Sequence, residues 1–123
     1  MKRGLTLLAL SVLAGASGCD HQPAPPQPGA DAAARLRGKA LLAAYGCVAC
    51  HHIEGMDAPQ RTAGPPLDRI ADNSYIAGVL PNNDEALAHW IMAPRRISPG
   101  TAMPDLGVNA EEARAMVAYL YSQ

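Results

Sequence analysis

The segment Cys47-Val48-Ala49-Cys50-His51 carries the most specific chemistry in this 123-residue chain. Cys-x-x-Cys-His is the attachment signature of c-type haem. Two cysteines one helical turn apart can bond both vinyl groups on one edge of the haem ring, and the histidine that follows can reach the iron. The motif therefore predicts one covalently bound haem c, held by Cys47, Cys50 and His51.

Three other interpretations of these cysteines have less support in the sequence. A thioredoxin-like Cys-x-x-Cys needs a preceding strand in a βαβ setting, and the flanking sequence has helical periodicity. A zinc site needs two more ligands at suitable spacing, but only His52 adjoins the motif, and His21 and His89 are isolated. A structural disulfide would leave the core of so small a domain unexplained.

A second axial ligand for the iron must come from elsewhere in the chain. The candidates are the spare histidines and four methionines, Met56, Met92, Met103 and Met116. Met116 belongs to an apolar helical stripe, Met92 precedes a helix stop, and Met56 follows the motif too closely to cross the ring. Met103 lies in the irregular segment Ser98–Pro104, which can hold a thioether at a fixed point. The sequence favours Met103.

Helices must position these groups, and no segment alternates convincingly as a strand. Asp31 can cap a first helix that ends at Gly46. Asn83 can cap a second helix that Pro94 ends, and Asn109 begins a third with a capping-box pattern. The apolar residues at helical spacing are Leu36, Ala40, Leu41, Ala44 and Tyr45, then Leu87, Trp90 and Ile91, then Ala113, Met116, Val117 and Leu120. We expect an all-α fold.

Composition supports a small domain built around a large cofactor. The hydrophobic fraction is 49%, yet the chain has no phenylalanine, four tyrosines and one tryptophan. Large rings usually dominate the burial of a small core, so a haem would supply what the side chains lack. The net charge of −1 argues against a nucleic-acid binder. We expect no small-molecule substrate, since no catalytic nucleophile or acid–base pair stands out.

The N-terminal residues have the pattern of a secretory signal peptide. Two basic residues precede the short apolar segment Leu5–Leu13, and small residues follow. Ala16-Ser17-Gly18-Cys19 resembles a bacterial lipobox, which predicts removal of residues 1–18 and acylation of Cys19. Cleavage after Ala16 is the alternative. Lipidation is favoured because it removes an unpaired thiol, and Asp20 resembles the residue that retains Gram-negative lipoproteins in the inner membrane.

The mature chain is then expected to have two parts. Residues 19–34 are rich in proline and alanine and form an extended tether, and residues 35–123 form the haem domain. The expected location is the outer, periplasmic face of the cytoplasmic membrane, with a soluble periplasmic protein as the alternative.

The order of motifs resembles the class I monohaem cytochrome c family. The resemblance covers roughly Gly38 to Tyr121. It rests on a glycine-bearing first helix, the Cys-x-x-Cys-His motif, Gly64-Pro65-Pro66-Leu67, Pro99–Pro104 and an aromatic-bearing last helix. The chain looks especially like the cytochrome c domains of haem–copper oxidases, including those fused to subunit II.

The resemblance implies roles for individual residues. His51 would be the proximal iron ligand and Met103 the distal one, and the carbonyl of Pro65 would accept the other ring N–H of His51. Residues expected to hold the propionates or pack on the ring are Thr101, Trp90, Tyr75 and Asn82. Relatives often have arginine near the position of Asn73, so here either Arg69 substitutes for it or the propionates are more exposed.

The resulting hypothesis is a membrane-tethered carrier of single electrons. Its partners would be a terminal oxidase or a quinol:cytochrome c reductase. Two alternatives remain, a fixed haem subunit of a larger respiratory or denitrification complex, and an open-site haem enzyme or gas sensor. Five basic residues could form a rim for an acidic partner or be ordinary solvated charges: Arg35, Arg37, Lys39, Arg95 and Arg96.

Overall fold

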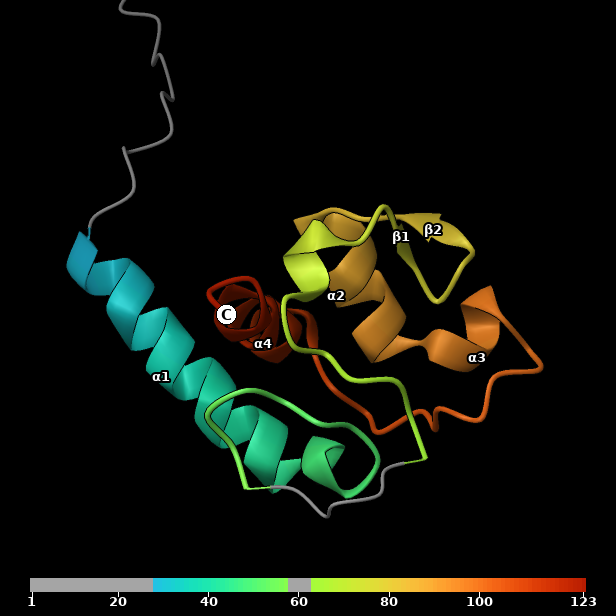
Figure 1. Cartoon of the computed structure of the whole chain (residues 1–123), viewed down its shortest axis with the longest axis horizontal. Coiled ribbons are helices and arrows are strands. Elements are labelled where there is room, and N and C mark those ends of the chain that lie inside the picture. The colour runs from blue at the N-terminus through green and yellow to red at the C-terminus, as the bar shows by residue number, and fades with distance from the viewer. Residues whose placement is uncertain (1–27, 58–62) are drawn as a thin grey trace, which may run out of the picture.

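The computed structural model describes residues 28–57 and 63–123. The expected signal peptide, Cys19, His21 and most of the tether lie outside them. The elements in chain order are α1 (Pro28–Ala44), the 3-10 turns η1 (Cys47–Ala49) and η2 (Ile70–Asp72), β1 (Tyr75–Ile76), β2 (Leu80–Pro81), α2 (Asp84–Met92), α3 (Pro94–Ile97) and α4 (Ala110–Leu120). The fold is helical, and α4 lies between α1 and α2 (Figure 1).

Helix α1 begins earlier than the sequence predicts. It starts at Pro28, so residues 28–34 are helical where an extended tether was expected, and Asp31 lies in the first turn rather than at the cap. Proline suits the first turn of a helix, because its missing N–H would have no partner there. The alanines that follow have the highest helix propensity of all residues. These two preferences outweigh the tether-like composition.

The other helix ends agree with the sequence prediction. The backbone of Gly46 is left-handed, with φ 71°, just after α1 ends. The Asn83 side chain accepts a hydrogen bond from the amide of Ala86 at 2.9 Å and caps α2. At α4, Asn109 and Glu112 form both hydrogen bonds of a capping box. These caps are local, which is why the sequence alone could locate them.

A small hairpin is present where no strand was expected. Strands β1 and β2 pair antiparallel, with Ile76 opposite Leu80. The turn is closed by a 3.0 Å hydrogen bond from the amide of Val79 to the carbonyl of Ile76. Its central residues, Ala77 and Gly78, both have positive φ, at 50° and 73°. Strands of two residues are too short to show alternation, so the pattern was not visible in the sequence.

Helices α1 and α4 cross in direct backbone contact at Gly38. A Cβ atom at this position would lie 1.9 Å from the carbonyl oxygen of Ala115. One turn further along α1, Leu42 is fully buried. Leu36 is 72% exposed, so the expectation that it belongs to the core face is wrong. The actual core face follows from where Gly38 lets the two helices meet.

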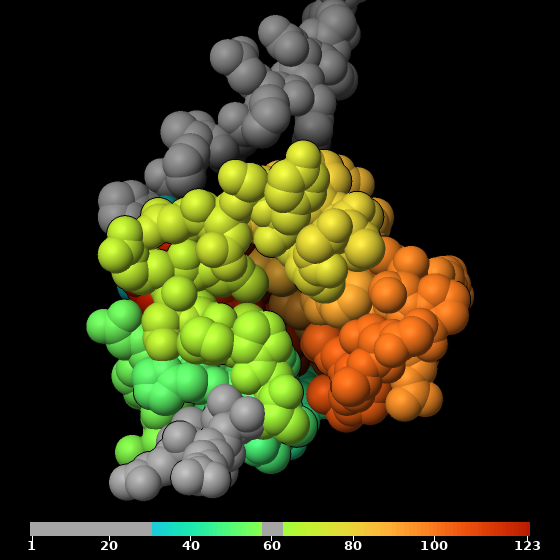
Figure 2. All heavy atoms as spheres, turned by 45° about the vertical axis from the view of Figure 1, so that its right-hand side comes forward, coloured from blue at the N-terminus to red at the C-terminus, as the bar shows by residue number. Residues whose placement is uncertain are grey.

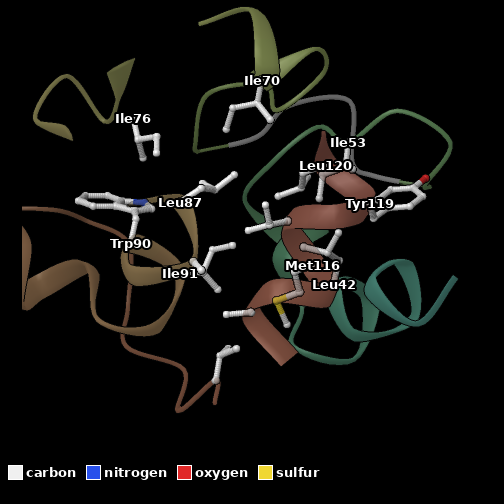
Figure 3. Packing of buried hydrophobic residues seen from close by; sticks show 14 residues of the cluster. Leu42, Ile53, Ile70, Ile76, Leu87, Trp90, Ile91, Met116, Tyr119 and Leu120 are labelled. Atoms are coloured by element: carbon white, nitrogen blue, oxygen red, sulfur yellow. The ribbon is translucent and has the colours of Figure 1, made fainter. Parts of the chain in front are cut away.

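The hydrophobic core has two sides, which Figure 3 shows separately. Leu42, Met116 and Leu120 gather where α1 meets α4, and Leu87, Trp90 and Ile91 project from α2. Within the described residues, no helix combines the length and the apolar character needed to cross a lipid bilayer.

Candidate functional site

A cavity of about 440 Å³ lies between the helices and the loops of residues 63–77 and 101–108. We call it the central cavity. Figure 2 shows its opening between the yellow-green loop and the orange segment, with the red atoms of α4 inside. Both sides of the core contribute to its wall, through residues such as Leu87, Trp90, Ile91, Met116 and Leu120.

The Cys-x-x-Cys-His segment forms one side of the central cavity. Residues 47–49 are a single 3-10 turn, and the amides of Cys50 and His51 both donate to the carbonyl of Cys47, at 3.2 and 3.0 Å. Cys47 and Cys50 do not form a disulfide with each other, and both line the cavity together with His51. Burial raises the pKa of the Cys47 thiol, and its backbone hydrogen bond partly offsets the rise.

The imidazole of His51 is oriented by a backbone carbonyl. Its Nδ1 lies 2.8 Å from the carbonyl oxygen of Pro65. A carbonyl can only accept a hydrogen bond, so Nδ1 is the nitrogen that donates, and in the neutral ring Nε2 is the nitrogen with the lone pair. Metal-binding histidines have this arrangement, because the second ring nitrogen fixes the tautomer and the ring orientation.

Further hydrogen bonds hold the Pro65 loop against the motif. The amide of Gly64 donates to the carbonyl of Cys50 at 2.6 Å, and the amide of Leu67 donates to the carbonyl of His52 at 2.8 Å. A Cβ atom at position 64 would lie 2.5 Å from Cε1 of His51. Residue 64 must therefore be glycine for the loop to approach the histidine ring this closely.

A histidine–aspartate hydrogen bond that the sequence did not predict lies next to this loop. Nδ1 of His52 is 2.6 Å from Oδ2 of Asp68. The other carboxylate oxygen of Asp68 is buried and has no hydrogen-bond partner in the described part of the chain. The two residues lie 16 positions apart, so only the folded loop brings them together.

Met103 lies on the same cavity as His51. Its amide donates to the hydroxyl oxygen of Thr101 at 3.2 Å, and the amide of Thr101 donates to the carbonyl of Ser98 at 3.0 Å. The segment is irregular rather than helical, as the sequence predicts. Met116 also lines the cavity, but it is fully buried in the core, and Met56 and Met92 do not line it.

The four residues proposed to hold the propionates or pack on the ring fall into two groups. Trp90, Tyr75 and Thr101 line the central cavity. Asn82 does not, and its amide nitrogen donates to the carbonyls of Ile70 and Asn73, at 2.7 Å each. Its amide oxygen accepts a hydrogen bond from Tyr121. Asn82 therefore ties the hairpin region to the end of α4.

Arg69, the candidate substitute for the arginine that the family resemblance implies near position 73, lies outside the cavity wall. Asn73 lines the cavity, whereas Arg69 is absent from its wall and has a side chain 75% exposed. Its guanidinium pairs with Asp72 at 2.5 Å. The backbone of Arg69 has positive φ, at 53°, and this conformation directs the residue into the η2 turn.

Tyr45 links the cavity wall to the start of α4. Its hydroxyl donates to Oε2 of Glu112 at 2.8 Å, and the same oxygen accepts from the amide of Asn109 at 3.1 Å. This bond to Glu112, followed by burial, raises the pKa of Tyr45. Sequence reasoning placed Tyr45 on a helical face and Glu112 in a cap, but it could not pair two residues 67 positions apart.

The central cavity suits a large, flat, apolar group bound through sulfur and nitrogen. Its volume falls within the range of about 300–1,000 Å³ that is usual for cofactor pockets. None of the described residues in its wall is Asp, Glu, Lys or Arg. The only donors to soft metals there are the cysteine thiols, His51 and the methionine thioethers, which are the ligands of haem iron and of its covalent attachment.

Comparison with known proteins gives two related results. The sequence model of the cytochrome c family matches residues 36–123. The chain is also 33% identical over 87 residues to cytochrome c oxidase subunit 2 of Alkalihalophilus pseudofirmus, an alignment covering 70% of this chain and 25% of that protein. Identity to cytochrome c oxidase subunit 2 of Bacillus sp. (strain PS3) is 32% over 80 residues, covering 62% and 22%. The chain thus spans about a quarter of the length of these relatives.

Proposed function

Because this chain belongs to the cytochrome c family, we propose that it is a membrane-tethered carrier of single electrons that delivers them to a terminal oxidase. Electron transfer itself follows from the family, whose members transfer electrons with haem c. The tether, the partner and the axial ligands are our proposal, and each has its own support.

The chain binds one haem c covalently, since Cys47 and Cys50 have the family's attachment spacing. The bound haem supplies an iron that gains or loses one electron. The residues around it hold this iron in place. We propose that Nε2 of His51 and the thioether of Met103 are its two axial ligands. The observation that carries this proposal is the hydrogen bond from Nδ1 of His51 to Pro65, which leaves Nε2 available toward the cavity that Met103 also lines.

Two protein ligands would leave no vacant coordination position. Such a site favours electron transfer over binding of oxygen or peroxide, because the ligands need to move little between oxidation states. A thioether ligand and the uncharged wall of the central cavity both favour Fe(II), so we expect a high reduction potential. Trp90, Tyr75 and Thr101 are the proposed contacts of the propionates and the ring face.

The proposed partner rests on the relatives, both of which are subunits of cytochrome c oxidase. A lipid anchor at Cys19 and the residues that follow would keep the domain near a membrane-bound oxidase. A quinol:cytochrome c reductase is the proposed electron donor. A fixed subunit of an oxidase complex is favoured second, because the relatives carry this domain within a subunit. Mild salt should release a carrier from purified membrane complexes but leave a subunit bound.

The deciding experiment is an intact mass of the mature protein, combined with optical spectra. We expect a mass that includes one haem and the acyl chains on Cys19. The oxidised protein should show the weak far-red sulfur-to-iron band, and the reduced protein should not bind CO. Met103→Ala should abolish the band and allow CO to bind, whereas Met56→Ala should change neither.

Each part of the proposal can fail separately. A mass without haem would overturn electron transfer itself and revive a thiol or zinc module. Haem without the far-red band, together with CO binding, would indicate an open-site haem enzyme or gas sensor. Haem without acyl chains would leave the carrier but make it soluble.

A further inference from the structure

The hydrogen bond between His52 and Asp68 joins the two segments of the chain that meet at His51. His52 directly follows His51 in the sequence. Asp68 lies three residues after Pro65, whose carbonyl oxygen is 2.8 Å from Nδ1 of His51. Nδ1 of His52 lies 2.6 Å from Oδ2 of Asp68. The carboxylate therefore binds the neighbour of His51 and belongs to the same loop as the carbonyl that orients the His51 ring.

The loop of residues 63–68, which we call the Pro65 loop, has no regular structure to hold it in place. None of its residues belongs to a helix or a strand, and its two prolines have no amide hydrogen to donate. Beyond the prolines, the amide of Leu67 donates to the carbonyl of His52 at 2.8 Å. His52 is thus bound to the loop through both its backbone and its side chain, and Asp68 supplies the second of these bonds.

The carboxylate of Asp68 is kept at a cost to the folded chain. Its Oδ2 is bonded to His52, but its Oδ1 is buried and has no hydrogen-bond partner among the residues that the structure describes. A buried carboxylate oxygen without a partner loses the hydration that it has in the unfolded chain. Such atoms are rare in folded proteins and need an explanation. The bond to His52 is what the folded protein gains from a carboxylate at this position.

We propose that Asp68, bonded to His52, is a positioning residue for His51. By fixing the Pro65 loop, it keeps the Pro65 carbonyl within hydrogen-bond distance of Nδ1 of His51. The inference rests on the proposed function, in which Nε2 of His51 binds the iron. A hydrogen bond to Nδ1 raises the basicity of a metal-binding imidazole, and a more basic ligand favours Fe(III). Loosening the Pro65 loop should therefore raise the reduction potential.

The Nδ1 proton of His51 reports on this geometry in NMR spectra of the reduced holoprotein, in which low-spin iron is diamagnetic. In Asp68→Ala, exchange of this proton with solvent should become about tenfold faster, because the loop opens more often without the bond. Its resonance should move upfield, since a longer hydrogen bond deshields the proton less, and the reduction potential should rise. The last two are properties of the closed state, so a loss of stability alone would not change them.

Two further variants identify the bond as the cause. Asp68→Asn keeps an oxygen that can accept from His52, so exchange should stay within about threefold of the unaltered protein. His52→Ala removes the same bond from a side chain that is 56% exposed, and it should match Asp68→Ala. The double variant should exchange no faster than either single variant, because both remove one interaction. If Asp68→Ala does not mature with haem, His52→Ala provides the same measurement.

Asp72→Ala is the matched control. It removes a carboxylate four residues further along the chain, and this carboxylate pairs with the exposed Arg69. The exchange rate and the resonance of the His51 proton should stay unchanged in this variant. Its reduction potential measures the effect of losing one negative charge, and the rise in Asp68→Ala should exceed that effect.

Three results would overturn the proposal. An unchanged resonance and potential in Asp68→Ala would show that Asp68 only stabilises the folded chain. Equal changes in Asp68→Ala and Asp72→Ala would assign them to the lost charge. Effects of Asp68→Ala and His52→Ala that add in the double variant would show that Asp68 does not act through His52. The proposed function fails separately, because an unaltered protein without haem, or with high-spin reduced iron, would refute its ligands before any variant is compared.

Discussion

The crossing of α1 and α4 and the wall of the central cavity are built in opposite ways. At the crossing, two backbones touch at Gly38, and Leu42, Met116 and Leu120 are almost completely buried. The wall, mainly residues 63–108, combines helix α2 with loops, short turns and a hairpin of two-residue strands around a space of about 440 Å³.

This difference separates what the polypeptide can stabilise by itself from what it cannot. At the crossing, Leu42, Met116 and Leu120 also line the cavity, but they are almost completely buried, so the crossing depends less on the cofactor. In the wall, Ile70, Ile76 and Val108 are buried, but one side of each lines the cavity. An empty apolar space forfeits the contacts of the atoms that line it. We therefore expect the wall to depend on the haem and the crossing to be much less dependent on it.

We expect the largest effect from removing the haem, by combining Cys47→Ala with Cys50→Ala. Amides in residues 63–108 should then exchange with solvent at rates close to those of an unfolded chain, whereas amides in α1 and α4 should exchange more slowly. Hydrogen exchange measured by segment tests this. Val48→Ala, which keeps both thiols, is the control. Equal protection of amides in both regions would refute the claim that the wall depends on the haem more than the crossing does.

The second prediction concerns the crossing. Gly38→Ala should destabilise the protein by about 2 kcal/mol or more, because the new methyl group would meet the carbonyl of Ala115. This loss runs against helix propensity, which favours alanine over glycine by about 1 kcal/mol. Denaturant unfolding measures the difference. The reverse change at an exposed position, Ala40→Gly, should cost only ~1 kcal/mol from propensity. A stabilised Gly38→Ala variant would show that the helices can separate without cost.

The third prediction concerns strain in the wall. Ala77 has φ 50°, a left-handed conformation that costs a non-glycine residue about 1–2 kcal/mol. Ala77→Asn should stabilise the holoprotein by ~0.5–1 kcal/mol, since Asn-Gly is the preferred pair in such a turn. Thermal unfolding of the holoprotein provides the measurement. Ala71→Asn, at an exposed position without positive φ, should give no gain.

The smallest effect belongs to the Arg37–Glu111 ion pair, which joins α1 to α4 at the surface. Its hydrogen bond and charge lower the pKa of Glu111 below the ordinary value of 4.5. Because the folded-state pKa is lowered, the pair stabilises the protein above the ordinary glutamate pKa. That contribution disappears as the pH falls through the lowered value.

Glu111→Gln should therefore lower the melting temperature slightly at neutral pH and low salt. The difference from the unaltered protein should vanish in high salt or at low pH, because the pair is exposed and screened. Melting curves at several pH values and salt concentrations provide the measurement. A difference that grows as the pH falls would contradict the assigned sign.

Local signals in the sequence predicted most of the helical frame. Asn83, Asn109 and Gly46 act on their immediate neighbours, so their roles could be recognised without tertiary structure. Tertiary packing decided the rest. The burial of Leu42 and the exposure of Leu36 depend on where Gly38 meets α4, and nothing in the periodicity of α1 alone fixes that point.

The residues of the candidate site fall into the same two groups: some could be recognised from local sequence, and others depend on tertiary contacts. The spacing of Cys47, Cys50 and His51 indicated their chemistry directly. Contacts between distant residues could not be inferred from spacing, which is why the Tyr45–Glu112 and His52–Asp68 pairs went unpredicted. For Asn82, residue type pointed toward the cofactor, but in the folded chain both of its amide N–H groups donate to backbone carbonyls and its amide oxygen accepts from Tyr121.

Gly38 also has a consequence for the thiols nine residues later in the chain. At this residue the backbone of α1 touches that of α4, so the glycine fixes how far α1 extends along its partner before it ends at Ala44. A slip of one residue would shift every later position by about 1.5 Å and turn it by about 100°. Cys47 would then no longer face the cavity. A residue without a side chain thus sets the register of α1 against α4, and through that register the position of the two sulfur atoms.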